Sequence, residues 1–335
     1  MTLDLPLIWA GLIAFAVLAY VILDGFDLGI GILFPLFREE RERDRVMNTV
    51  APVWDGNETW LVLGGGGLLA AFPLAYSVVL PALYAPLITM LLGLIFRGVA
   101  FEFRWRTRRW KRVWDYSFAL GSLVATLMQG IALGGLVQGI HVVGRAYAGG
   151  WWDWLTPFSI LTGVALVIGY ALLGATWLIV KTDGEIQDRC YLLAHRLAIL
   201  LVAMIGIVSL WTPFLDERFL ARWFHWPNIA LTAPMPVLVL VAAWVLWRGL
   251  HDRRREVQPF LAALALFVLS YIGLGISFWP MMVPPAISFR DAAAPDASLG
   301  FLLVGAVILL PVILAYTAYA YRVFRGKVDE HAGYH

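Results

Sequence analysis

Four acidic residues stand in two pairs within stretches of sequence that are otherwise apolar. The first pair, Asp24 and Asp27, lies in LDGFDLGIG, and the second pair, Asp55 and Glu58, lies in WDGNETW. The members of each pair are three residues apart, so they share one face of a helix. A carboxylate inside a membrane costs roughly 3 kcal/mol, so it normally faces a partner, a cavity or a proton path. The two pairs therefore mark a candidate site for proton chemistry.

The composition of the chain indicates that these stretches lie in a membrane. Of its 335 residues, 61% are hydrophobic and only 14% are charged, whereas soluble domains carry about 25% charged residues. The first apolar run has no small-residue cleavage site, so we expect a membrane helix there rather than a removed signal peptide. The single cysteine, Cys190, excludes an internal disulfide, a cysteine-ligated iron–sulfur cluster and a C-x-x-C-H haem attachment. We therefore expect an all-α polytopic membrane protein.

Nine apolar segments are long enough to span a bilayer, and we expect them to form one integral-membrane domain over residues 1–335. Each can cross a hydrocarbon core of about 30 Å at about 1.5 Å per residue. The segments are residues 6–34, 49–71, 75–99, 116–140, 156–180, 193–213, 228–247, 259–281 and 299–321. Because nine is odd, the two termini are expected on opposite sides of the membrane.

The basic residues are distributed unevenly among the connections between these segments. Four connections that follow odd-numbered segments contain REERERDR (38–45), RWRTRRWKR (104–112), RGLHDRRR (248–255) and RVFRGK (322–327). This side of the chain holds 21 of the 25 basic residues, and by the positive-inside rule it is cytoplasmic. We therefore expect the N-terminus outside and the C-terminus inside. The opposite connections carry GGWWDW and RWFHWP, which is typical of tryptophan anchoring at the headgroup layer.

Counting along the first two segments places the two acidic pairs at a similar depth. Asp27 lies about ten residues, roughly 15 Å, from the expected cytoplasmic end of its helix, and Glu58 lies about ten residues into the next helix. Two adjacent antiparallel helices thus bring four carboxyl groups together in the inner half of the membrane. Desolvation and mutual repulsion predict that part of this group holds protons near neutral pH.

Arg97, near the inner end of the third segment, is the nearest candidate countercharge for this group. Two interpretations stay open and are compatible. In the first, the cluster holds and exchanges protons within reach of the cytoplasm. In the second, it is a structural knot of ion pairs and hydrogen bonds that also includes Asn48, Asn57 and Thr59.

Two other patterns bear on the chemistry. The run GGGG (64–67) lies within the second segment, with no strand before it and no Lys-Ser/Thr after it, so a nucleotide loop is excluded and close helix packing is expected. All six histidines stand at helix ends or in loops, whereas a haem-binding bundle usually directs histidine or methionine inward from facing helices. Redox chemistry is therefore expected to come from a partner.

The residues alone also allow two other functions. A proton-coupled secondary transporter would bury carboxylates too, but transporters commonly contain internal repeats with paired interrupted helices. Here the acidic residues concentrate in the first two segments, and segments five to nine offer no counterpart. A purely structural assembly subunit, in which Asp55 serves stability alone, is the other alternative.

Long stretches of the chain resemble subunit II of the cytochrome bd-type quinol oxidases, including the cyanide-insensitive branch of that family. LDGFDLGIGILFPL (23–36), VMNTVAPVWDGNETWLVLGGGGLLAAFP (46–73) and LIFRGVAFEFR (94–104) follow the family pattern in order and spacing. The similarity continues through residues 152–178, 278–285 and 309–326. These enzymes are the terminal oxidases of aerobic bacterial respiration.

This resemblance implies a fold of two four-helix bundles plus one peripheral helix, and a heterodimer in the bacterial cytoplasmic (inner) membrane. The partner, subunit I, is expected to hold two haem b and one haem d, or three haem b, while subunit II ligates no haem. The complex would oxidise quinol at the outer side and reduce O2 to water with cytoplasmic protons. A structural quinone and a small accessory subunit occur in some members. The expected surroundings are membrane lipid, with no nucleic acid partner.

The resemblance also implies roles for particular residues. Asp55 matches the aspartate of the family's W-D-G-N motif, with Trp54 and Asn57 beside it. Asp24 and Asp27 match the D-G-F-D motif, and Arg97 matches the arginine of the third helix. Glu58 occupies a position where family members vary, so it is expected to be an accessory proton site. Together these residues are expected to form the cytoplasmic part of a proton path toward the partner.

Overall fold

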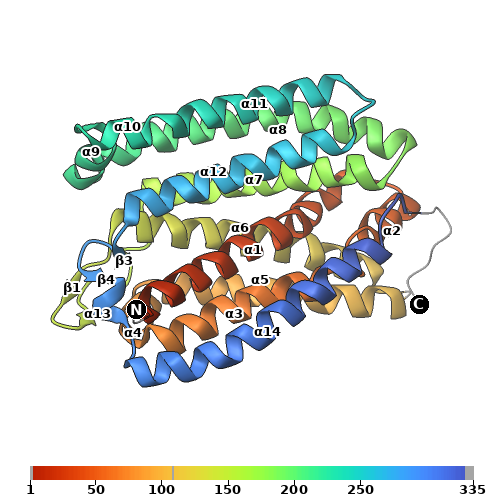
Figure 1. Ribbon diagram of the computed structural model, residues 1–335. Helices are drawn as coiled ribbons and strands as arrows, with labels where there is room; N and C mark the ends of the chain where they lie inside the picture. The colour runs from red at the N-terminus through yellow and green to blue at the C-terminus, as the bar shows by residue number, and fades with distance from the viewer. Residues whose placement is uncertain (1–2, 108, 329–335) are drawn as a thin grey trace.

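The computed structural model describes residues 3–107 and 109–328, and it is almost entirely helical (Figure 1). Within these residues eight helices are long and apolar enough to cross a membrane, or nine when the bent pair α3–α4 counts as one span. The long helices are α1 (Leu5–Leu33), α3 (Trp54–Ala71), α5 (Tyr84–Arg106), α6 (Lys111–Gln138), α7 (Pro157–Lys181), α8 (Gly184–Trp211), α11 (Pro234–His251), α12 (Val257–Phe278) and α14 (Asp296–Val323). The predicted all-helical membrane class is confirmed. Arg108, within one of the basic stretches, lies outside the described residues.

The predicted third segment, residues 75–99, is wrong at both ends. Its first part belongs to a separate helix, α4 (Pro73–Ala82), whose axis turns by 120° from that of α3. The spanning helix α5 begins only at Tyr84 and continues past the predicted end. Pro73 explains the break, because proline has no N–H to continue the hydrogen bonding of α3 and fits the first turn of a new helix.

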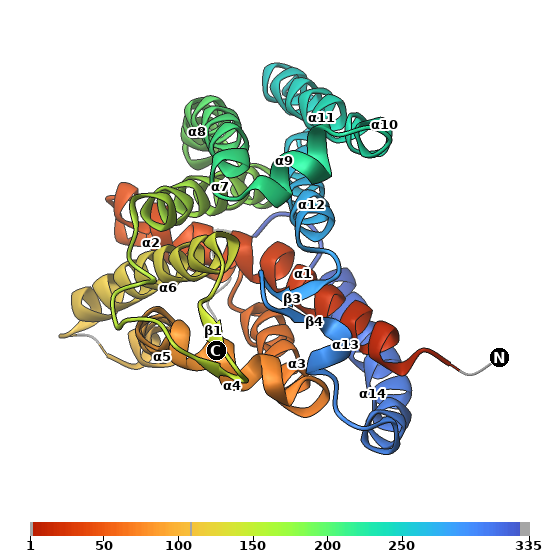
Figure 2. The same ribbon diagram turned by 90° about the vertical axis from the view of Figure 1, so that its left-hand side faces the viewer.

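The long helices pack in two groups, which are joined where α1 and α6 of the first group pack against α7 of the second (Figure 2). In the first group α1 contacts both α3 and α6, and α6 contacts α5 along much of its length. In the second group α7, α8, α11 and α12 pack against one another in turn. α14 lies at the edge of the first group, where it contacts α1 and α3.

The short elements gather at the two ends of the long helices (Figure 1). One end, called here the basic end, carries the 3-10 helix η1 (Phe34–Leu36), helix α2 (Glu40–Asn48) and the turns α5–α6, α7–α8 and α11–α12. The opposite end carries α4, η2 (Thr212–Phe214), α9 (Glu217–Phe224), α10 (Asn228–Thr232), α13 (Phe289–Ala292) and the antiparallel strand pairs β1 (Val142–Val143) with β2 (Ala146–Tyr147) and β3 (Met281–Val283) with β4 (Ile287–Ser288). α1 begins at the opposite end, and α14 finishes at the basic end.

Glycines let α1 and α7 cross at very short range. A Cβ atom on Gly29 would stand 1.8 Å from the carbonyl oxygen of Tyr170, and one on Gly174 would stand 2.5 Å from the carbonyl carbon of Gly29. No side chain fits between two backbones at that distance. This crossing fixes the part of α1 that carries the first acidic pair against the middle of the molecule.

The four-glycine run of α3 packs closely on one side only. A Cβ on Gly64 or Gly67 would stand 3.4 Å from a side chain of α1, whereas Gly65 and Gly66 have no atom of this chain within 4 Å of that position. The predicted close packing is therefore confirmed for two of the four glycines. The other two lie on an open surface of α3.

Candidate functional site

One arginine stands among three of the four predicted carboxylates. Nη2 of Arg97, on α5, lies 3.1 Å from Oδ1 of Asp24 and 3.9 Å from Oδ2 of Asp27, both on α1. Nη1 of the same guanidinium forms an ion pair with Glu58 of α3. The side chains of Arg97 and both aspartates are 0% exposed, whereas Glu58 is 23% exposed. Three helices thus supply one charged group, called here the acidic knot (Asp24, Asp27, Glu58 and Arg97).

Asn57 and Tyr321 extend the acidic knot by hydrogen bonds. The Nδ2 group of Asn57 donates to Oδ2 of Asp27 at 2.7 Å and to the carbonyl oxygen of Leu23 at 3.2 Å. The hydroxyl of Tyr321, near the end of α14, donates to Oδ1 of Asn57 at 2.9 Å. Tyr321 was not predicted from the sequence, because it is one of three tyrosines in α14 (Tyr316, Tyr319 and Tyr321) and their spacing does not show which of them meets Asn57.

Asp55 lies outside the acidic knot, although it was expected to share a face with Glu58. It is exposed in the first turn of α3, and its carbonyl oxygen accepts a hydrogen bond from the Thr59 hydroxyl at 3.1 Å. Successive residues of an α-helix are about 100° apart. Since Asn57 points inward to Asp27, Asp55 is directed about 200° away from it and Glu58 takes an intermediate direction. Thr59 likewise bonds within its own helix rather than to the arginine.

A layer of aromatic rings lies on the basic side of the acidic knot. Trp54 stacks on Phe101 with ring centroids 4.8 Å apart and planes only 8° from parallel. Phe101 contacts Phe118 edge to face at 5.1 Å, and Phe118 contacts Phe34 in the same way at 5.0 Å. The guanidinium carbon of Arg97 lies 5.6 Å from the centroid of Phe101. Trp54, predicted as a supporting residue, therefore touches the arginine only through this ring.

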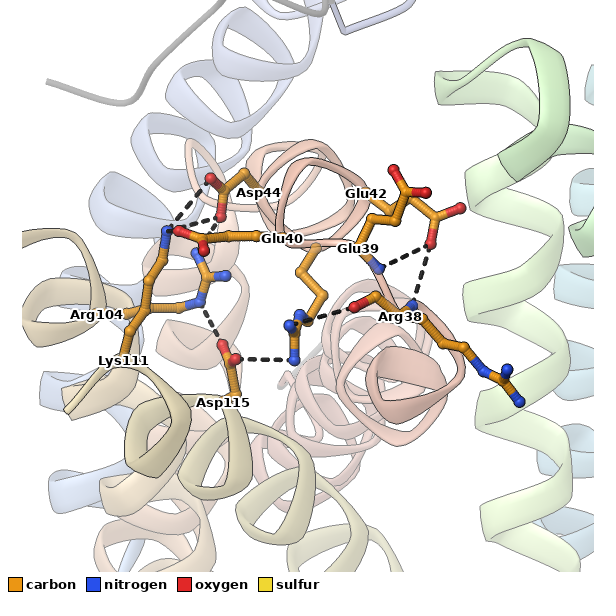
Figure 3. Close-up of polar contacts among 9 residues, drawn as sticks. Arg38, Glu39, Glu40, Glu42, Asp44, Arg104, Lys111 and Asp115 are labelled. Atoms are coloured by element: carbon orange, nitrogen blue, oxygen red, sulfur yellow. Dashed lines mark hydrogen bonds and ion pairs between the residues drawn. The ribbon is translucent and has the colours of Figure 1, made fainter. Parts of the chain in front are cut away.

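A second charged group occupies the basic end beyond this layer (Figure 3). Arg104, seven residues after Arg97 on α5, has a side chain that is 0% exposed and donates through Nε to Asp115 of α6 and through Nη1 to Asp44 of α2, both at 2.6 Å. Lys111 binds Glu40 at 2.5 Å and Asp44 at 3.2 Å, and Arg43 lies 3.1 Å from Asp115. The sequence predicted these basic stretches as connections and missed that they interlock.

The ion pair between Lys111 and Glu40 changes the acidity of the carboxyl group. The hydrogen bond from Lys111 lowers the pKa of Glu40 below its ordinary value of 4.5. Glu40 therefore stays ionised at neutral pH and ties α2 to the start of α6. This second group is salt-like and charge-balanced, in contrast to the acidic knot.

The positions of the histidines and acidic residues bear on metal binding. Among residues 3–107 and 109–328, no cluster of three or more His, Cys, Asp or Glu side chains could hold a metal ion. His195 and His251 face each other near the basic end with ring centroids 4.8 Å apart, and His141 and His225 are exposed at the opposite end. His331 and His335 lie outside the described residues.

Similarity to known proteins extends over nearly the whole chain. The family model for cytochrome bd terminal oxidase subunit II matches residues 5–324. Cytochrome bd-I ubiquinol oxidase subunit 2 of Escherichia coli (strain K12) is 30% identical over 365 residues, which cover 97% of this chain and 96% of that protein. Cytochrome bd ubiquinol oxidase subunit 2 of Bacillus subtilis (strain 168) is 28% identical over 336 residues, with 96% of each chain covered.

A solved structure has the same fold. The bd oxidase from Geobacillus thermodenitrificans aligns with a TM-score of 0.76 at 19% identity, covering 96% of this chain and 99% of that chain. The family match and the relatives confirm the resemblance drawn from the D-G-F-D and W-D-G-N motifs. Together they identify the chain as part of a respiratory oxidoreductase complex in a membrane. The chain belongs to the cytochrome bd terminal oxidase subunit II family.

Proposed function

We propose that this chain is the subunit that delivers cytoplasmic protons to a haem-bearing subunit I, where O2 is reduced to water with electrons from quinol. In this proposal the partner holds all the haems, either two haem b and one haem d or three haem b. The basic end faces the cytoplasm of a bacterium, in keeping with the positive-inside rule. The N-terminus is outside, and the complex generates a proton-motive force by taking up protons from one side only.

The observation that carries this proposal is a graded exposure of carboxyl groups. Asp55 is exposed, the side chain of Glu58 is 23% exposed, and those of Asp24 and Asp27 are 0% exposed. Successive acids along such a series can pass protons between a surface and an interior. A knot built only for stability has no need for an acid on the surface beside it.

The charge balance of the acidic knot supports the same conclusion. Three carboxyl groups contact one guanidinium, so full ionisation would leave two uncompensated negative charges in a buried place. Desolvation and like-charge repulsion disfavour that state, and protonation relieves it. The acidic knot is thus suited to hold protons that it can exchange.

The aromatic layer decides where we place the route. Trp54, Phe101, Phe118 and Phe34 form a series of ring contacts, with Arg97 of the acidic knot against Phe101 and Arg104 of the second charged group against Phe34. The three phenylalanine rings carry no hydrogen-bonding group, so protons are not expected to pass straight along the inside of the helix group. We place the route on the outer face of α3, where Asp55 and Glu58 lie.

That outer face has the character of a subunit contact. Val62 is 72% exposed, and it follows Asp55 by seven residues, so the two share one face of α3. Gly66 lies on the same side with open space before it, and Phe96 of α5 is 57% exposed. We propose that subunit I packs here and receives protons from the two acids. The two helix groups would then be the four-helix bundles of the family, with α14 as the peripheral helix.

The test is quinol-driven oxygen uptake by the purified two-subunit complex carrying Asp55→Asn. Haem content is measured first by absorption spectroscopy. The expected result is full haem content with slow turnover whose pH dependence differs from that of the wild type. Glu185→Gln is the matched control, because Glu185 is an exposed acid in the first turn of α8, away from the proposed route.

Two other outcomes would each assign a different role to Asp55. Loss of haem together with activity would assign Asp55 to the stability of the subunit contact. Normal haem content with normal turnover would overturn the proposed role of Asp55 and direct the same experiment to Glu58.

A further inference from the structure

A groove runs between α11 and α12, in the helix group that does not contain the acidic knot. Its volume is about 950 Å³. The walls are apolar side chains of both helices, and the mouth is the loop that connects them at the basic end. The wall residues used below are Val241, Val245, Leu261, Ala265 and Leu269.

The length of the groove matches one leaflet of a bilayer. Its lining on α12 extends from Val257 at the mouth to Leu269, which is about 18 Å along a helix at about 1.5 Å per residue. Half of a hydrocarbon core of about 30 Å is about 15 Å. The groove therefore leads from the membrane surface at the basic end to roughly the middle of the membrane.

The charges at the mouth leave one arginine without a partner. Each of the other charged residues there is paired, as Arg253 with Asp188, Arg255 with Asp252, and Glu256 with Lys327. Arg254 is exposed, and within the described part of the chain its side chain has no ion pair or hydrogen bond. The mouth of the groove thus carries one arginine, Arg254, whose guanidinium is free to bind an anion.

We propose that this groove binds one anionic phospholipid of the cytoplasmic leaflet. The phosphate would bind Arg254, and an acyl chain would lie between Val241 and Val245 of α11 and Leu261 and Ala265 of α12. Basic pockets between membrane helices on the cytoplasmic side are suited to acidic headgroups. A neutral isoprenoid such as a quinone would match the walls equally well, but it would leave the arginine uncompensated. The charge at the mouth therefore decides in favour of a phosphate.

The test is native mass spectrometry of the purified two-subunit complex after exposure to equal amounts of phosphatidylglycerol and phosphatidylcholine. The wild type is expected to retain one phosphatidylglycerol in preference to phosphatidylcholine. Arg254→Gln should reduce that retention about fivefold, the effect of one basic side chain at a membrane surface. Arg112→Gln is the matched control, because Arg112 is an exposed arginine at the basic end of α6, outside the groove.

A second variant tests whether the apolar walls of the groove are needed for lipid binding, separately from the charge of Arg254. Ala265→Phe fills the groove but keeps Arg254, so it should also lose the bound lipid, whereas Ile272→Phe on the same helix outside the lining should retain it. Haem content confirms that each complex is assembled. Equal retention of the two lipids by the wild type, equal retention by the Arg254 and Arg112 variants, or a retained quinone in place of the lipid would overturn the proposal.

Discussion

The guanidinium of Arg97 is the residue on which the acidic knot depends. It contacts all three carboxyl groups of the knot and has no exposed surface of its own. Removing one partner of a buried ion pair is far more harmful than replacing the whole pair, because a charge is left without compensation. The geometry of the knot therefore allows a direct test at a single position.

Arg97→Gln should destabilise the subunit by roughly 3–5 kcal/mol, since it leaves buried carboxyl groups without their cation. The thermal midpoint and the haem content of the purified complex measure this loss. Arg97→Lys should be intermediate, because a lysine restores the charge but not the two-armed geometry. Wild-type stability in the glutamine variant would show that the knot does not depend on this ion pair.

Particular residues show what the sequence could predict about the site. The depth of Asp24, Asp27 and Glu58, together with that of Asp55, was predicted from residue counts, because a count along a helix is a distance along the membrane normal. Arg97 was predicted as their countercharge from its place near the inner end of the third segment, and the structure brings it to three of the four carboxyl groups. The outward direction of Asp55 was not predicted, since the spacing of three relates Asp55 to Glu58 but does not say which neighbour, here Asn57, points inward. Which further side chains bond to the acidic knot depends on how the helices pack, and the spacing of residues along one helix does not determine that packing.

At the scale of helices, the crossing of α1 and α7 has no room for any side chain. Gly29→Ala would place a methyl group 1.8 Å from the carbonyl oxygen of Tyr170, so the two helices would have to separate. We expect a loss of about 3 kcal/mol or more and a lower yield of haem-containing complex. Gly206→Ala on α8 is the control, because no atom lies within 4 Å of that position. Equal yields for the two variants would contradict the close crossing.

The ion pair between α2 and α6 should give stability that depends on pH. Because Lys111 lowers the pKa of Glu40 below 4.5, the pair contributes fully above about pH 4.5, and the contribution is lost as the pH falls through the lowered pKa. Glu40→Gln should therefore lower the thermal midpoint at pH 7, and its difference from the wild type should shrink at pH 4.

Solvent exposure limits how much the ion pair between Lys111 and Glu40 can contribute to stability. The Glu40 side chain is 65% exposed, and exposed ion pairs contribute about 0–1 kcal/mol. A difference for Glu40→Gln that stays constant from pH 7 to pH 4 would rule out the ion pair as its cause.

The spanning helices were predicted correctly from hydropathy, but a local break within one of the predicted segments was not. The long apolar runs predicted the spanning helices because each must satisfy its backbone hydrogen bonds inside the membrane. The predicted end of the second segment at residue 71 agrees with the end of α3, but the break at Leu83 that separates α4 from α5 was missed, although Pro81 stands just before it. A proline in a membrane helix can bend it or be accommodated by its neighbours, so the sequence alone did not distinguish one continuous helix over residues 75–99 from the short α4 followed by α5.

At the scale of the whole molecule, the open face of α3 predicts a specific failure of assembly. Gly66→Leu adds a large side chain where this chain has no atom within 4 Å, so the subunit itself should fold normally. If subunit I packs on this face, the leucine should reduce co-purification of the two subunits by about tenfold or more, a cost of at least 1.4 kcal/mol.

The control for this variant is Gly206→Leu on α8 in the other helix group, where an added Cβ likewise meets no atom of a neighbouring element within 4 Å. It should leave co-purification unchanged. Equal yields of the two-subunit complex for both leucine variants would place the partner on a different face. The membrane level of each subunit, measured before extraction, separates weak association from poor expression.

The uneven distribution of arginine and lysine predicted which connections lie together, and the structure gathers α2 and the turns α5–α6, α7–α8 and α11–α12 at one end. Charge therefore predicts the arrangement of a membrane chain along the membrane normal. It does not predict the order of helices within the plane, which depends on contacts such as the glycine crossing of α1 and α7.

The hydrogen bond from Tyr321 to Asn57 also bears on how the chain is made. The acidic knot takes its charges from helices near the start of the chain, but the hydroxyl that completes it comes from the final helix. Beyond that helix, the Nζ group of Lys181 donates to the carbonyl oxygens of Phe324 and Gly326. During translation, the first helices must therefore wait in the membrane until α14 has been synthesised and inserted. A chain that stopped before α14 would lack the Tyr321 hydrogen bond, and Oδ1 of Asn57 would have no donor from that helix.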